Sequence, residues 1–358
     1  IKDALKKYIK VKSIAELPFL FVINTKKFEE ILNDLKIIST IRTLEEKNNW
    51  QEIFNLLQTY QPIEKSIIWN DAELLNSFSF ATAKLSECTE NLKRKFPDKN
   101  QRNKFIEEKR NLRNLTLTLR NRAIELQPNN ASFYSNLAYS YYQSVNELST
   151  VGGRRDGNIF EEAEKSIYYL NKALSINPNR LTDLYRKALL YSNILGTQKF
   201  FKEYNEVNIE KIKNDYLNSI KQSINCFTRI EQIYESITNT EEKQKQKKIY
   251  IKTLYHLAQK YLKLNKLNYN LFYNQNKLYE TDEITSNLKV ADNYIDKCIK
   301  IDYNRKKEET QIIEMATVNN FICGVFKTYL KGIIQMYLYL TTKNKIYENN
   351  SRQFLQQS

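Results

Sequence analysis

Apolar residues recur three and four positions apart through most of the chain, which is the spacing of one face of an α-helix. Within residues 131–193 this spacing predicts three amphipathic helices in succession. An alanine occupies a comparable place on the apolar face of each helix: Ala138, Ala173 and Ala188. Small side chains let neighbouring helix backbones approach closely, and Pro178 ends the second helix and forces a turn. The pattern therefore predicts helices that pack against each other in consecutive pairs.

The same helical spacing extends on both sides of this stretch, and no sustained alternation with a period of two is present. Only a short strand at Phe19–Ile23 is compatible with the sequence. The scarcity of glycine and proline, 6 and 5 among 358 residues, also favours long helices. We therefore predict an all-α protein with an N-terminal helical extension over residues 1–71, a repeat region over residues 72–304, and C-terminal capping helices with a polar tail over residues 305–358.

The distances between the alanines indicate a repeat. Ala123 lies 15 residues before Ala138, and Ala173 lies 15 residues before Ala188. This arrangement resembles the tetratricopeptide repeat (TPR), a helix–turn–helix unit of about 34 residues that stacks into a solenoid. About four units share the frame, and each carries an insertion between its two helices. The first unit matches least well, because Arg120 occupies a position that is normally apolar.

The resemblance implies a protein-interaction scaffold, because TPR domains bind peptides and partner domains in a concave groove lined by the first helix of each unit. Carried over by register, the groove positions hold aromatic, amide and cationic side chains: Asn136, Tyr139, Tyr142, Tyr185, Arg186, Asn193, Lys252, Tyr255, His256 and Gln259. Such rings supply contact area at low entropy cost, and amides can bond a peptide backbone. The lysine and asparagine clamp that holds chaperone tails in some TPR proteins is not expected, since Ser135, Tyr185 and Tyr255 stand where lysine would.

Two alternatives stay open. Residues 50–87, in which Trp69-Asn70-Asp71 leads into Phe78 and Ala81, resemble the start of TPR modules in larger bacterial effectors, including those joined to caspase-like CHAT proteases in prokaryotic defence. That resemblance implies a regulatory or sensor module. A net charge of +15 suggests instead a helical scaffold associated with nucleic acid. Because the lysines are scattered among glutamates, we favour a protein or peptide partner, and an acidic one would suit the charge.

No cofactor, metal ion or catalytic activity is expected. The four cysteines lie far apart and form no CxxC pair: Cys88, Cys226, Cys298 and Cys323. The single histidine, His256, has no companion ligand and no neighbouring serine or cysteine nucleophile in the sequence. The glycine-rich segment 152–157 contains Arg154 and Arg155, which could hold an anion, but it lacks the Lys-Ser/Thr pair of a nucleotide-binding loop.

The last predictions concern location. Thiols without a disulfide pattern, together with the lack of a signal peptide, predict a cytoplasmic protein. The most apolar stretch, Phe321–Leu340, contains Lys327 and Lys331, so it is expected to be a buried helix rather than a membrane span. Because the chain begins at Ile1 rather than methionine, we expect it to be part of a longer protein.

Overall fold

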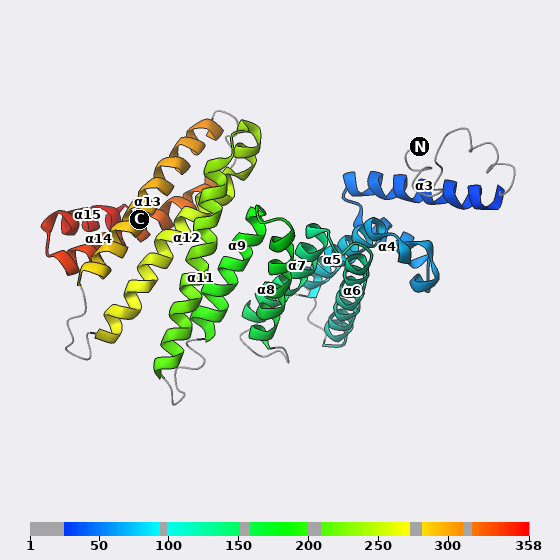
Figure 1. The fold of residues 1–358 in the computed structure, drawn as a ribbon, viewed down its shortest axis with the longest axis horizontal. Helices are drawn as coiled ribbons and strands as arrows, with labels where there is room; N and C mark the ends of the chain where they lie inside the picture. The colour runs from blue at the N-terminus through cyan, green and yellow to red at the C-terminus, as the bar shows by residue number, and fades with distance from the viewer. Residues whose placement is uncertain are drawn as a thin grey trace. The chain divides into compact units, whose positions relative to one another are not determined.

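The computed structural model describes residues 25–93, 99–150, 158–199, 209–272, 281–310 and 317–357, and every regular element among them is a helix (Figure 1). The prediction of an all-α protein is confirmed. The possible strand at Phe19–Ile23 lies outside the described residues. The chain divides into two compact units, Ile1–Ser140 and Tyr141–Ser358.

The described residues of unit 1 form four helices and the first half of a fifth: α3 (Thr25–Glu46), α4 (Trp50–Gln58), α5 (Ala72–Lys93), α6 (Lys99–Leu126) and α7 (Ala131–Thr150). Two 3-10 turns, Ile63–Lys65 and Ile67–Asn70, connect α4 to α5. The Asp71 carboxylate accepts hydrogen bonds from the amides of Glu73 and Leu74 at 3.0 and 3.1 Å. This side chain satisfies amides that have no partner within the helix, so Asp71 caps the start of α5.

Helices α5 and α6 form an antiparallel pair, because residues closer to the C-terminal end of α5 contact residues closer to the N-terminal end of α6. The hydroxyls of Thr82 and Thr116 meet at 2.7 Å, and Ser79 accepts a hydrogen bond from Arg120 at 3.3 Å. Arg120 is only 2% exposed and also donates to the backbone carbonyl of Asn136 in α7. Its departure from the repeat pattern therefore has a structural reason: charge-assisted bonds offset the burial of the guanidinium.

Unit 2 contains the second half of α7 and then eight more elements: α8 (Ile159–Ile176), α9 (Leu181–Leu189), the π-helix η4 (Leu190–Gln198), α11 (Ile209–Ser236), α12 (Thr240–Phe272), α13 (Thr281–Thr310), α14 (Thr317–Thr342) and α15 (Lys345–Gln356). Successive helices again pair antiparallel. In α12 and α13, for example, the Cys298 thiol donates to the Ile251 carbonyl at 3.4 Å, while the rings of Tyr261 and Tyr294 stack at 5.9 Å. The limits of the predicted repeat region, residues 72 and 304, fall at the start of α5 and inside α13.

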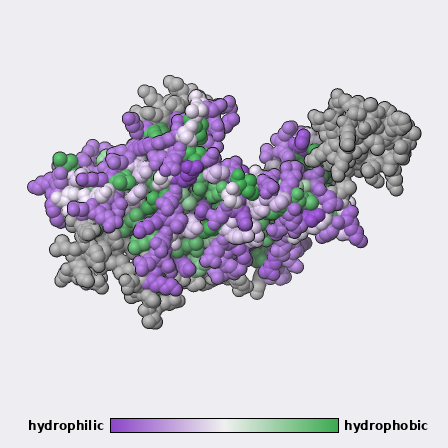
Figure 2. Space-filling model, viewed as in Figure 1, coloured by the Kyte–Doolittle hydropathy of each residue, from purple (hydrophilic) through white to green (hydrophobic). Residues whose placement is uncertain are grey.

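The alanines that define the repeat are all buried at helix contacts. Ala138, Ala173 and Ala188 are 0% exposed, and Ala123 is 1% exposed. A larger side chain at such a contact would push the helices apart, at a cost of about 1–3 kcal/mol. Figure 2 shows mostly hydrophilic residues on the visible surface, with smaller hydrophobic patches between them, as expected when each helix turns its apolar face towards its neighbours.

The apolar helix α14 packs against α13 and α15, and its two lysines are buried and pair with aspartates. Lys331 donates to Asp292 at 2.6 Å and to Asp296 at 2.8 Å. Lys327 is 8% exposed and donates to Asp302, which is 4% exposed. None of the helices in the described ranges is long and apolar enough to cross a membrane.

Candidate functional site

One face of unit 2, formed by α9, η4 and α12, contains most of the predicted groove residues. Helix α9 with η4 is the first member of one antiparallel pair, and α12 is the first member of the next. They run parallel to each other, since Tyr185 contacts His256 and, further towards the C-terminal end of both helices, Asn193 contacts Lys260. We call this surface the α9–α12 face. The predicted residues on its helices are Tyr185, Arg186, Asn193, Lys252, Tyr255, His256 and Gln259.

An aromatic cluster occupies one end of the α9–α12 face. The His256 Nε2 lies 3.0 Å from the Tyr185 hydroxyl, and the Phe227 ring of α11 stacks on the imidazole with centroids 5.3 Å apart. Tyr255 meets the same imidazole edge-on at 5.5 Å. Burial, together with the charge of Lys260, lowers the pKa of His256 to about 3, so the imidazole is neutral at physiological pH. Burial also raises the pKa of Tyr185, so its hydroxyl stays protonated.

A lysine that the sequence did not single out lies at the middle of the face. Lys260 is 0% exposed, and its Nζ donates to Asn193 Oδ1 at 3.3 Å and to Gln259 Oε1 at 3.0 Å. No carboxylate in the described part of the chain pairs with it. Burial, with the nearby charge of Lys263, lowers the pKa of Lys260 to about 7. The helical spacing carried a signal for this burial, because Lys260 follows the buried Leu257 by three positions.

The ammonium group of Lys260 determines which groups the neighbouring amides offer to a ligand. An ammonium is only a donor, so Asn193 and Gln259 turn their carbonyl oxygens towards it. The same Asn193 oxygen also accepts from the Ser192 hydroxyl at 3.2 Å. The NH₂ group of Asn193 has no hydrogen-bond partner among the described residues, whereas the Gln259 side chain also interacts with the His256 imidazole. One exposed donor beside a positive charge is therefore available to an acceptor group of a ligand.

The π-helix η4 positions the polar residues of this face opposite α12. The Thr197 hydroxyl donates to the carbonyl five residues earlier at 2.8 Å and accepts from Lys263 at 3.3 Å. Gly196 suits the widened turn, because a Cβ at this position would lie 2.9 Å from the Tyr191 carbonyl oxygen. π-Helices are rare and are frequently found at functional sites.

Positive charge predominates on the α9–α12 face. Lys252 is exposed, whereas Arg186 is partly neutralised by Asp183, 3.5 Å away and 1% exposed. The charges of three lysines on α12 all lower the pKa of His256: Lys260, Lys252 and Lys263. Like charges held this close favour a ligand that brings negative charge.

The predicted residues of the second repeat unit are divided between the two compact units. Asn136 donates to Asn76 at 2.8 Å within unit 1, so its amide contributes to the fold. Tyr139 also belongs to unit 1. Tyr142 belongs to unit 2 and lies close enough to Tyr185 to raise its pKa.

Nothing in the described ranges forms a metal site, since no three His, Cys, Asp or Glu side chains there are placed to share an ion. Cys226 and Cys298 are free and buried, and burial raises the pKa of the Cys226 thiol, which makes it unreactive. The predicted anion-binding loop with Arg154 and Arg155 lies outside the described residues. That the chain is not an enzyme stays a prediction.

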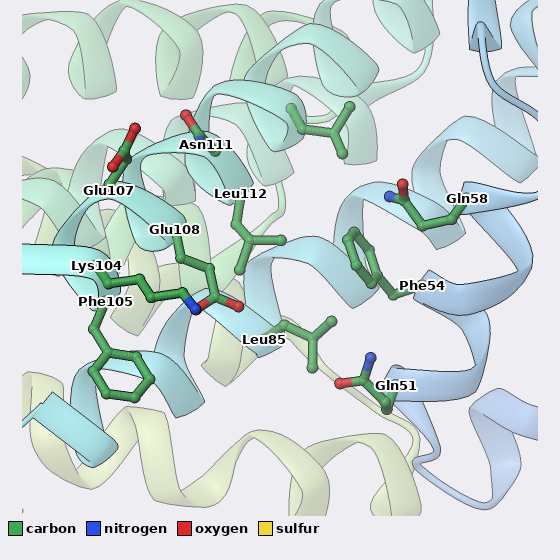
Figure 3. A pocket seen from close by; sticks show the side chains of 11 residues that line it. Gln51, Phe54, Gln58, Leu85, Lys104, Phe105, Glu107, Glu108, Asn111 and Leu112 are labelled. Carbon is green, nitrogen blue, oxygen red and sulfur yellow. The ribbon is translucent and has the colours of Figure 1, made fainter. Parts of the chain in front are cut away.

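Unit 1 contains a separate pocket of about 730 Å³ between α4, α5 and α6 (Figure 3). Phe54, Leu85 and Leu112 supply apolar walls, whereas Lys104 and Glu108 bring charges of both signs. This lining selects no class of ligand. The α9–α12 face is therefore the better-defined candidate site.

No protein-family model and no curated protein matches the chain. Among solved structures, the chain is similar to one described as "Human IFIT1 dimer with PPP-AAAA". That match covers 99% of this chain and 93% of the other, with 13% sequence identity and a TM-score of 0.15. A similarity of this size supports no inference about function.

Proposed function

We propose that the chain is a non-catalytic protein-interaction scaffold that binds an acidic peptide segment on the α9–α12 face. The observation that carries this proposal is the environment of Lys260, a buried ammonium whose acceptors are the amide oxygens of Asn193 and Gln259. A buried cation without an anion costs free energy, and a bound carboxylate would reduce that cost. The free NH₂ group of Asn193 would donate to the same carboxylate or to a peptide carbonyl.

The length of the face suits an extended peptide better than a single ion. The α12 partners of Tyr185 and Thr197, His256 and Lys263, are seven positions apart, which corresponds to about 10 Å along the helix axis. About three residues of extended chain cover that distance. The rings near Tyr185 would contact apolar parts of the peptide, and Lys263 near Thr197 would face its acidic side chains.

The experiment compares the binding of three fluorescent twelve-residue peptides to the full chain by anisotropy: one rich in Asp and Glu, its Asn and Gln counterpart, and a Lys-rich one. We expect the acidic peptide to bind at least about ten-fold tighter than the amide counterpart at low salt, and less tightly as salt screens the charges. Asn193→Asp replaces an exposed donor with an anion that pairs with Lys260, so this variant should lose binding. Gln356→Glu makes an equivalent change at an exposed position of α15 and should bind like the wild type.

Equal binding of the acidic and amide peptides would contradict the proposal. Unchanged binding by Asn193→Asp would show that the α9–α12 face is not the site. A labelled RNA or DNA oligonucleotide that binds when the acidic peptide does not would support the nucleic-acid alternative instead.

A further inference from the structure

A pocket in unit 2 adjoins the α9–α12 face and lies between α12, α13 and α14. Its volume is about 210 Å³. We call it the α12–α14 pocket. At about 30 Å³ for a water molecule, this volume corresponds to roughly seven waters, and it is below the range of about 300–1,000 Å³ that is typical of sites for drug-sized ligands. The pocket therefore suits a small molecule with one or two rings.

The walls of the α12–α14 pocket are mainly apolar and aromatic. Ile251, Tyr255 and His256 contribute from α12, and Phe326 contributes from α14. Phe326 is 56% exposed, which is unusual for so large an apolar ring, and a bound ligand would cover it. Aromatic rings pack favourably in offset and edge-to-face arrangements, so these walls favour a planar ligand over a saturated one.

The charges at the pocket favour an anion. Asp302 lines the pocket but is neutralised by Lys327, with which it forms a buried ion pair. Lys248 and Lys252 also line it and are exposed, and neither pairs with a carboxylate in the described ranges. Two uncompensated ammonium groups thus flank apolar walls. In addition, the Nδ1 of His256 is buried without a hydrogen-bond partner, a deficit that a polar group of a ligand would relieve.

We propose that the α12–α14 pocket binds a small aromatic carboxylate, with its ring against Phe326 and Tyr255 and its carboxylate near Lys248 and Lys252. This activity is separate from peptide binding on the α9–α12 face. The two sites share Lys252, Tyr255 and His256, so occupation of the pocket changes the surface that a peptide contacts.

The probe is indole-3-carboxylate, titrated into the full chain and followed by ligand-observed NMR and calorimetry. Indole-3-carboxamide has the same shape without the charge, and cyclohexanecarboxylate has the charge without the aromatic ring. We expect saturable binding of indole-3-carboxylate and at least several-fold weaker binding of both controls. Equal binding of the carboxamide would overturn the assignment to an anion, and no saturable binding at millimolar concentration would overturn the site.

Two variants at exposed positions test the pocket without disturbing the core. Phe326→Ala should weaken binding about ten-fold, and Lys252→Gln should weaken it about two- to five-fold. Tyr329→Ala and Lys345→Gln are the matched controls, because Tyr329 is 51% exposed on the same helix and Lys345 is exposed on α15, and neither lines the pocket. Binding that is equally weakened by the controls, or unaffected by Phe326→Ala, would overturn the proposal.

The outcome is independent of the proposed function. The probe is not a peptide, so loss of acidic-peptide binding in Asn193→Asp with indole-3-carboxylate binding intact would support both proposals. Binding of the peptide without binding of the probe would remove only the α12–α14 pocket.

Discussion

Replacement of Lys260 by methionine should make unit 2 more stable at neutral and acidic pH. The protein lowers the pKa of this lysine from 10.5 to about 7. At about 1.4 kcal/mol per pH unit, the cost of holding the charge reaches about 5 kcal/mol below pH 7. Methionine has a similar length and no charge, but it also removes the hydrogen bonds to Asn193 and Gln259. We therefore expect a net gain of about 1–4 kcal/mol at pH 6.

The gain should disappear as the pH rises. Between pH 7 and 10.5 the unfolded chain binds a proton at Lys260 that the folded chain does not, so the wild type becomes more stable with increasing pH. Over the two pH units from 7 to 9 this amounts to about 2–3 kcal/mol. Lys260→Met lacks this group and should show no such rise. The two unfolding free energies should therefore converge near pH 9.

Urea unfolding measured at several pH values tests this reasoning. The chain has two tryptophans, Trp50 and Trp69, and both lie in unit 1. Tryptophan fluorescence therefore reports on unit 1, whereas far-UV circular dichroism reports on the helices of both units. Lys260→Met should shift only the dichroism transition, and Lys221→Met, at an exposed position of α11, should shift neither. A Lys260→Met protein that is less stable at pH 6, or whose gain does not change with pH, would refute the argument.

Three further variants or titrations test individual contacts of the helices of unit 2, at Asn193, His256 and Gly332. Asn193→Asp should raise the pKa of Lys260 and stabilise unit 2 at pH 7, while it abolishes acidic-peptide binding. Urea unfolding measures the stability and anisotropy measures the peptide binding, and a less stable variant would contradict the contact between Asn193 and Lys260. His256 is the only histidine in the sequence, so its NMR resonances are unambiguous, and they should not titrate between pH 7.5 and 5. The free energy of unfolding should fall as the pH drops from 6.5 towards about 3, because the unfolded chain binds the proton at a higher pH than the folded chain does. Gly332→Ala should lower the thermal unfolding temperature and the free energy of unfolding by about 1–3 kcal/mol. The new Cβ would lie 2.7 Å from Leu355 Cγ and 3.2 Å from the Leu355 backbone nitrogen. An unchanged unfolding temperature would mean that α15 shifts to make room.

The periodicity of the sequence determined the helices and their pairing. Ala138, Ala173 and Ala188 predicted close helix contacts, and all three are fully buried. Because repeat units place their first helices side by side in parallel, register alone also brought residues as distant as Tyr185 and His256 onto one face. A repeating pattern encodes such relations because each unit packs on the next in the same way.

Only the tertiary structure decided the electrostatics of the site. Lys260 lies at helical spacing from Leu257, but the extent of its burial and the groups that it contacts depend on how α9, η4 and α12 pack together. The lysines of α14 are similar: Lys331 finds Asp292 some 39 positions away, and Lys327 finds Asp302 some 25 positions away. Helical spacing is a local property, whereas the pKa, partner and exposure of a charged group depend on every helix around it. The helices and the contact between Tyr185 and His256 could therefore be predicted from the sequence. The buried ammonium, the orientation of its amides and the α12–α14 pocket exist only once the helices pack.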